Sequence, residues 1–266
     1  MHATAVPALP HRDLLPEVLR IAQEAGQAIM AVYNAMSGTA DEVRYKADGS
    51  PLTQADLAAH RVIAHGLAQL TPEIPVVSEE DSGSEVYRKP TGRFWLVDPL
   101  DGTKEFLARN GEFTVNIALV EDGHPVLGVV VAPALGQSYW GSAGQGAWRD
   151  AGGKVEPIHV ATAQQRAGRP VRVLASKSHL NEETRAYLQQ LGPHQLVQAG
   201  SSLKFCRMAE GSADLYPRLG PTCEWDTAAG QAVLEAAGGT VQDRHGAPLC
   251  YGKPTSANPA FVARLR

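Results

Sequence analysis

The segment from Phe113 to Pro133, FTVNIALVEDGHPVLGVVVAP, constrains the fold more than any other part of the chain. Two apolar runs flank Asp122-Gly123, and Asp-Gly between apolar runs is the strongest short-range signal for a β-hairpin. The segment at 136–150, GQSYWGSAGQGAWRD, has the pattern of a second hairpin. Its glycines follow the order G-x-x-G-x-G without a following Lys-Ser/Thr, so we interpret them as bends in a β-ribbon rather than a phosphate loop. The two hairpins predict an antiparallel sheet.

The rest of the chain adds helices to the first half and alternates strands with helices in the second. Apolar residues recur at helical spacing over 14–36 and 54–70, and short strands are predicted at 74–81 and 93–99. After a polar linker at 151–170 come predicted strands at 171–176, 194–200 and 213–218 and predicted helices near 181–191, 202–210 and 227–238. Such alternation is typical of α/β architecture. We expect an α+β domain at 1–150 and an α/β domain at 151–266, with the boundary between 141 and 170.

The composition narrows the classes of function. A formal net charge of −4 gives no basic footprint for a nucleic-acid polymer, although local geometry can still bind a small anionic ligand. No apolar run approaches the ~20 residues that span a bilayer, and the N-terminus lacks the pattern of a secretion signal. Three widely spaced cysteines are typical of reduced thiols. We therefore expect a cytoplasmic protein without a transmembrane segment; peripheral attachment to the inner membrane and a homodimer are left open.

Carboxylates stand at the ends of several predicted elements: Asp56, the run Glu79-Glu80-Asp81, Asp98, Asp101 and Asp226. Structural roles explain some of them. Thr53-x-x-Asp56 has the form of a capping box, with Asp in place of Glu. Asp226 is a suitable N-cap for the last helix, and Asp101 is a suitable cap for a short helix over GTKEFL.

Asp98 has no such simple explanation, because it directly follows the apolar residues FWLV, where an unpaired charge is costly to desolvate. Pro99 cannot donate a backbone hydrogen bond and fixes its own φ, so DPLD predicts a stiff corner that presents two carboxylates and the Leu100 carbonyl. Such hard oxygen ligands suit Mg²⁺. Without a cation, neighbouring carboxylates repel by roughly 4 kcal/mol per close pair at an effective dielectric constant of ~20.

The next residues are suited to an anion. Gly102 and Thr103 would place free N–H groups and a hydroxyl at the start of a helix, where phosphate groups bind readily. Carboxylates beside a phosphate site predict metal-assisted hydrolysis of a phosphate ester. In that chemistry, two cations about 3.5–4 Å apart hold the attacking water and the leaving oxygen.

Three motifs in order, VSEED, WLVDPLDGTKEF and WDTAAG, resemble those of the inositol monophosphatase superfamily of Mg²⁺-dependent, lithium-sensitive phosphatases. The resemblance covers roughly 14–262. Within the superfamily, the motifs are most similar to the bacterial 3'(2'),5'-bisphosphate nucleotidases, whereas inositol phosphatases usually have Asn at the position of Glu105. The resemblance implies an α/β (α+β) fold, a layered α-β-α-β-α sandwich of the sugar-phosphatase type, with the active site between two sheet domains.

The resemblance also implies a ligand set for two or three Mg²⁺ ions. Glu79, Asp98 and the Leu100 carbonyl resemble the ligands of the first metal. Asp98, Asp101 and Asp226 resemble those of the second, with Asp98 as the bridge. Most of these ligands come from the first domain, and the second contributes Asp226.

Other residues resemble those that handle water and substrate in the superfamily. Asp56 and Thr103 match the positions that orient the nucleophilic water, beside the catalytic Glu79. The residues matching phosphate or nucleotide contacts are Gly102, Thr103, Gly200, Ser201, Lys204, Arg218 and Asp226.

The function expected from the resemblance is Mg²⁺-dependent hydrolysis of the 3'-phosphate of 3'-phosphoadenosine 5'-phosphate to AMP and phosphate. Inositol monophosphatase or fructose-1,6-bisphosphatase activity on the same metal site is the alternative. A third hypothesis is a non-catalytic phospholigand sensor, but a sensor has no need of Thr103 and Asp56 beside two metal positions. In each case the partner is a small phosphorylated molecule.

Overall fold

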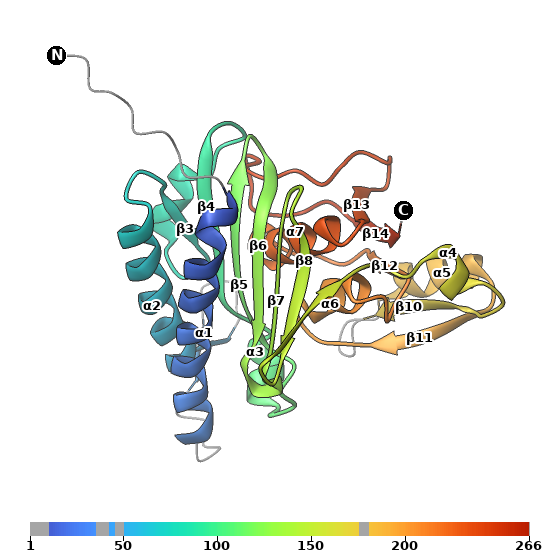
Figure 1. Cartoon of the computed structure of the whole chain (residues 1–266), viewed down its shortest axis with the longest axis horizontal. Helices are drawn as coiled ribbons and strands as arrows, with labels where there is room; N and C mark the ends of the chain where they lie inside the picture. The colour runs from blue at the N-terminus through green and yellow to red at the C-terminus, as the bar shows by residue number, and fades with distance from the viewer. Residues whose placement is uncertain (1–10, 36–42, 46–50, 176–180, 266) are drawn as a thin grey trace.

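Two β-sheets organise the computed structural model, which describes residues 11–35, 43–45, 51–175 and 181–265 (Figure 1). The helices are α1 (His11–Ala35), α2 (Gln54–Leu70), α3 (Thr103–Leu107), α4 (Ala163–Arg166), α5 (Glu182–Leu191), α6 (Leu203–Ala209) and α7 (Ala228–Ala236). Short 3₁₀ helices are η2 (Ser82–Tyr87), η3 (Pro133–Leu135) and η4 (Glu224–Asp226). Among the described helices, none combines the length and apolar character needed to cross a membrane.

The first sheet has seven strands in chain order, and only its first pair is parallel. Its strands are β3 (Val76–Ser78), β4 (Arg93–Asp101), β5 (Thr114–Glu121), β6 (His124–Ala132), β7 (Gln137–Ser142), β8 (Gly146–Ala151) and β9 (Lys154–Ile158). Both predicted hairpins are confirmed. Asp122 and Gly123 connect β5 to β6 with φ of 45° and 78°, as a two-residue hairpin turn with both central residues at positive φ requires.

The second sheet has the order β11-β10-β12-β14-β13 and mixes parallel with antiparallel pairs. Its strands are β10 (Val171–Ala175), β11 (His194–Gln198), β12 (Leu215–Arg218), β13 (Gly239–Asp243) and β14 (Phe261–Leu265). A separate two-stranded ribbon joins β1 (Val43–Tyr45) to β2 (Pro51–Thr53). The ribbon directly precedes α2, and residues 46–50, which connect its two strands, are outside the described residues.

The predicted α-β-α-β-α layering is confirmed. In Figure 1, α1 and α2 cover one face of the first sheet, and α6 and α7 lie between the two sheets. One core joins α1 and α2 to the first sheet. A second core joins the opposite face of that sheet to α6, α7 and the second sheet. A smaller cluster packs α5 on the outer face of the second sheet.

The middle layer depends on a close backbone approach at β6. A Cβ atom added at Gly128 would lie 2.3 Å from the carbonyl oxygen of Ala229 in α7, well inside contact distance. Glycine therefore lets α7 pack directly on the sheet. α7 begins two residues after Asp226, the last residue of η4. The close packing of α7 on the first sheet therefore also fixes the distance between η4 and that sheet.

The prediction of a polar linker at 151–170 is wrong in one respect. This stretch contains β9, which pairs with β8 and forms the edge of the first sheet. β9 was missed because its sequence, KVEPI, contains two charges and a proline, which is typical of an edge strand rather than a buried one. Residues 154–158 thus belong to the first sheet. The division into two domains stays a prediction.

Candidate active site

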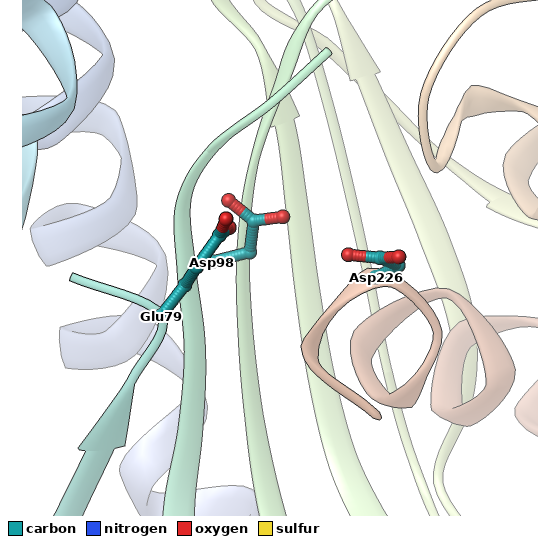
Figure 2. Close-up of side chains that lie close together, drawn as sticks. All are labelled: Glu79, Asp98 and Asp226. Carbon is teal, nitrogen blue, oxygen red and sulfur yellow. The ribbon is translucent and has the colours of Figure 1, made fainter. Parts of the chain in front are cut away.

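Three carboxylates from distant parts of the chain converge. Oxygen atoms of Glu79, Asp98 and Asp226 all lie within 4.8 Å of one another. Figure 2 shows Asp226 facing Glu79 and Asp98 from the opposite side. Carboxylate oxygens are the ligands that Mg²⁺ prefers in proteins, so the donor set suits a hard divalent cation.

The parallel pairing of β3 with β4 places the first two carboxylates together. Ser78 pairs with Val97, so the next residues on the two strands, Glu79 and Asp98, lie side by side. The Glu79 N–H donates to the Val97 carbonyl at 3.1 Å. Asp98 is only 1% exposed, which confirms that this carboxylate is buried.

The predicted corner after Asp98 is an irregularity within β4. The register with β5 shifts between Asp98 and Asp101, and the Leu100 N–H donates to Asp98 Oδ1 at 3.0 Å. Thr103 Oγ1 donates to the Leu100 carbonyl at 3.5 Å. The turn therefore brings the Leu100 carbonyl next to the first residue of α3.

Asp226 arrives from the second half of the chain as the last residue of η4. The expectation that it caps the last helix is wrong: the N-cap of α7 is Thr227. A 3₁₀ turn precedes α7, so Asp226 Oδ2 instead accepts the Cys223 N–H at 2.8 Å. Burial is the main cause that raises the pKa of Asp226 to about 8, and the charges of Asp101 and Glu79 add to it. A bound cation would reverse this penalty.

Asp101 is held by side chains from both halves of the chain rather than by α3. The expectation that it caps α3 is wrong, because the N-cap is Gly102 in the left-handed region, with φ of 89°. Asp101 Oδ2 instead accepts hydrogen bonds from Ser201 Oγ at 2.7 Å and Asn116 Nδ2 at 3.3 Å. These bonds aim its carboxylate toward the interface between the two sheets, where its charge acts on Asp226.

The capping box predicted at Asp56 is confirmed. Asp56 is 1% exposed, and its Oδ2 accepts from the N–H and Oγ1 of Thr53 at 2.7 and 2.6 Å. Asp56 thus stabilises the start of α2. Its role in orienting water stays a prediction.

A cavity of about 370 Å³ adjoins the carboxylates. It combines residues on either side of the interface, namely Asp101, Gly102, Thr103, Lys104, Glu105, Ser201, Lys204, Phe205, Tyr216, Arg218, Pro221, Thr222, Asp226 and Thr227. Four of the predicted substrate contacts from the second half are therefore brought together: Ser201, Lys204, Arg218 and Asp226. Gly200 has a different contact, since its N–H donates to Glu112 Oε2 at 2.9 Å.

Lys204 is a buried cation at the wall of this cavity. It is only 6% exposed, so it is not a solvated lysine on a helix surface. Its Nζ donates to the carbonyls of Ser201 at 2.6 Å and Ala199 at 3.4 Å, and lies 5.6 Å from the Tyr216 ring centre. Burial lowers the pKa of Lys204 to about 8, while the charge of Asp101 opposes the shift. Among the described residues, no carboxylate forms a salt bridge with it.

Sequence reasoning missed a polar chain behind the cavity. Asn116 Nδ2 donates to Ser202 Oγ at 2.9 Å, and Ser202 Oγ donates to the Asp226 carbonyl at 2.8 Å. Asn116 therefore connects Asp101 with Asp226 across the interface. The signal in the sequence was Asn116, an amide within the largely apolar run TVNIALV, and in the structure it is only 1% exposed.

In the sequence, Glu105 served only to distinguish the bisphosphate nucleotidases from the inositol phosphatases. It lines the cavity, and burial, followed by the charges of Asp101 and Glu112, raises the pKa of its carboxyl group. Glu105 is therefore a third acidic residue, after Asp101 and Asp226, that lines the same cavity as Lys204.

Comparisons with known proteins agree with this geometry. The model of the inositol monophosphatase family matches residues 13–263. The 3'(2'),5'-bisphosphate nucleotidase CysQ of Escherichia coli is 53% identical over 249 residues, which cover 93% of this chain and 98% of that protein. The crystal structure of CysQ from Bacteroides thetaiotaomicron has a TM-score of 0.83 at 38% identity, covering 96% of this chain and 97% of that one. The Thermotoga maritima IMPase has a TM-score of 0.74 at 25% identity, covering 95% and 92%. The chain therefore belongs to the inositol monophosphatase family.

Proposed function

We propose that this protein is a 3'(2'),5'-bisphosphate nucleotidase that removes the 3'-phosphate of 3'-phosphoadenosine 5'-phosphate, giving AMP and phosphate. The observation that carries the proposal is the convergence of Glu79, Asp98 and Asp226 beside a cavity walled by the buried cation Lys204. The similarity to the CysQ nucleotidases over nearly the whole chain supports the same substrate.

The residues present fit Mg²⁺. The proposed ligands are Glu79, Asp98, the Leu100 carbonyl, Asp101 and Asp226, which together could hold two or three ions. The raised pKa of Asp226 supports this, because a carboxyl group so placed gains most from a nearby cation. When bound, Mg²⁺ supplies charge neutralisation and activation of water for attack on a phosphate ester.

The chain's own residues would position the reactants. Gly102 and Thr103 start α3 and would bind the phosphate that is cleaved. Asp56 and Thr103 would orient the attacking water. Lys204 would bind the phosphate that is not cleaved, with Arg218 on the same wall. A buried ammonium group without a salt bridge gains from an anionic ligand, which favours a substrate with a second phosphate.

A phosphate-release assay tests this proposal. The substrates are the bisphosphate nucleotide, inositol 1-phosphate and fructose 1,6-bisphosphate, each with and without Mg²⁺. We expect the nucleotide to have the highest kcat/KM and release to require the metal. A much higher kcat/KM for either sugar-type substrate would reassign the enzyme within its family. Binding of these ligands without release of phosphate would favour a sensor. A cytoplasmic location and the oligomeric state stay predictions.

A further inference from the structure

Glu224 is a fully buried carboxylate two residues before Asp226, in the same 3₁₀ turn. It accepts hydrogen bonds from the N–H groups of Gly252 at 2.9 Å and Lys253 at 3.0 Å. Lys253 Nζ donates to it at 2.6 Å and Arg88 Nη1 at 3.4 Å. A buried carboxylate is costly unless it is paired and hydrogen-bonded. These four contacts satisfy that requirement and tie η4 to two other segments.

Arg88 links this network to the part of the chain that carries Glu79. It directly follows η2, which begins three residues after Glu79, and its side chain is only 3% exposed. Arg88 Nη1 also donates to the Lys253 carbonyl at 2.5 Å, and Nη2 donates to Glu85 Oε2 at 3.3 Å. The guanidinium group therefore contacts the segment after Glu79, the segment before Asp226 and the turn at 252–253.

The turn at 252–253 lies directly on the backbone next to Arg88. Gly252 has φ of 75°, and an added Cβ atom would lie 2.1 Å from the carbonyl oxygen of Lys89. Only glycine permits this approach. Backbone contact thus fixes the turn independently of the ion pairs.

We infer that Arg88, Glu224 and Lys253 form a clamp that positions Asp226 against Glu79 and Asp98 and so sets the affinity for Mg²⁺. This inference rests on the proposed function. When all three carboxylates are ionised, like charges within 4.8 Å repel, and without a cation this repulsion pushes η4 away from the first sheet. The ion pair between Glu224 in η4 and Arg88 after η2 opposes this repulsion, because it draws η4 toward the segment that carries Glu79. The clamp therefore holds the ligands near their binding positions before Mg²⁺ arrives.

Isothermal titration of metal-free protein with Mg²⁺ tests the clamp. Glu224→Gln keeps the shape of the side chain and removes its charge, and Lys253→Met removes one partner of the same carboxylate. Residues that orient metal ligands from behind typically change metal affinity by about tenfold to a hundredfold, and we expect an increase in Kd of that size. Saturating Mg²⁺ should restore kcat, because neither residue lines the cavity formed by the described residues.

The matched control is Asp214→Asn, which breaks ion pairs with Arg169 and Arg172 at a separate cavity. It should lower stability and leave the Kd for Mg²⁺ within about twofold, as expected for a distant site. Where Glu224→Gln fails to fold, Lys253→Met decides, because the Lys253 side chain is 26% exposed whereas that of Glu224 is fully buried. Wild-type affinity in the variants overturns the clamp alone. Absence of Mg²⁺ binding by the unmodified protein overturns the proposed function and the clamp with it.

Discussion

Asp226→Asn should stabilise the metal-free protein, by an amount that grows with pH. Burial, followed by the charge of Asp101, raises the pKa of Asp226 to about 8, against about 3.9 for an unfolded chain. Between these values the folded state binds more protons than the unfolded state, so the free energy of unfolding falls as pH rises. At about 1.36 kcal/mol per pH unit, the penalty near pH 7 reaches at most about 4 kcal/mol.

The substitution removes the charge and little else. Asn retains an oxygen that can accept the Cys223 N–H, so the existing 2.8 Å hydrogen bond can persist. Asp101, Glu79 and Asp226 titrate as an interacting group. Part of the free-energy cost of their charges therefore remains when Asp226 alone is neutralised. We therefore expect a gain of about 1–4 kcal/mol near pH 7 and almost none near pH 4.

Urea unfolding in the presence of a chelator, repeated across this pH range, measures the effect. Asp214→Asn is the control with the opposite sign. Burial raises the pKa of Asp214, but hydrogen bonds from Arg169 and Arg172 outweigh it and lower the pKa. The contribution of Asp214 to the free energy of unfolding is therefore present above about pH 4 and is lost as pH falls. With added Mg²⁺ the unmodified protein should become more stable to urea than Asp226→Asn, because the intact ligand set binds the ion better. A variant less stable than the unmodified protein near pH 7 without metal would refute the reasoning.

Three further predictions concern activity and packing. Asp98→Asn should nearly abolish phosphate release while leaving the thermal unfolding midpoint of the metal-free protein unchanged or higher; a large fall in that midpoint would mean that Asp98 is structural. Lys204→Ala should raise KM for the bisphosphate nucleotide by about tenfold to a hundredfold with little change in kcat or in use of a monophosphate. Because the pKa of Lys204 is about 8, KM of the unmodified enzyme should rise above that pH, and equal small effects on both substrates would argue against the contact. Gly128→Ala should reduce the free energy of unfolding in urea by about 1–3 kcal/mol or more, since its Cβ would overlap Ala229. Gly220→Ala, whose Cβ meets nothing closer than 3.6 Å, is the control, and an equal loss there would contradict the packing argument.

The sequence by itself determined the elements that depend on neighbouring residues. Asp122-Gly123 specifies a hairpin turn because its residues accept positive φ, and Thr53 with Asp56 begins α2 by a bond that spans three positions. The motifs also identified Asp98 as a charge that a structural role does not explain. These signals are local, so they can be read without knowing what lies opposite in the fold.

The tertiary structure alone decided which distant residues share a surface. The edge position of β9 follows from pairing with β8, and the burial of Lys204 follows from the packing of α6 between two sheets. Glu224 lies in a motif that sequence reasoning used only for Asp226, because its partners Arg88 and Lys253 are separated from it by 136 and 29 positions. Contacts of this kind depend on how whole layers stack, and the energy of a buried charge depends on its surroundings. Neither the stacking of layers nor the surroundings of a side chain can be read from a short stretch of sequence.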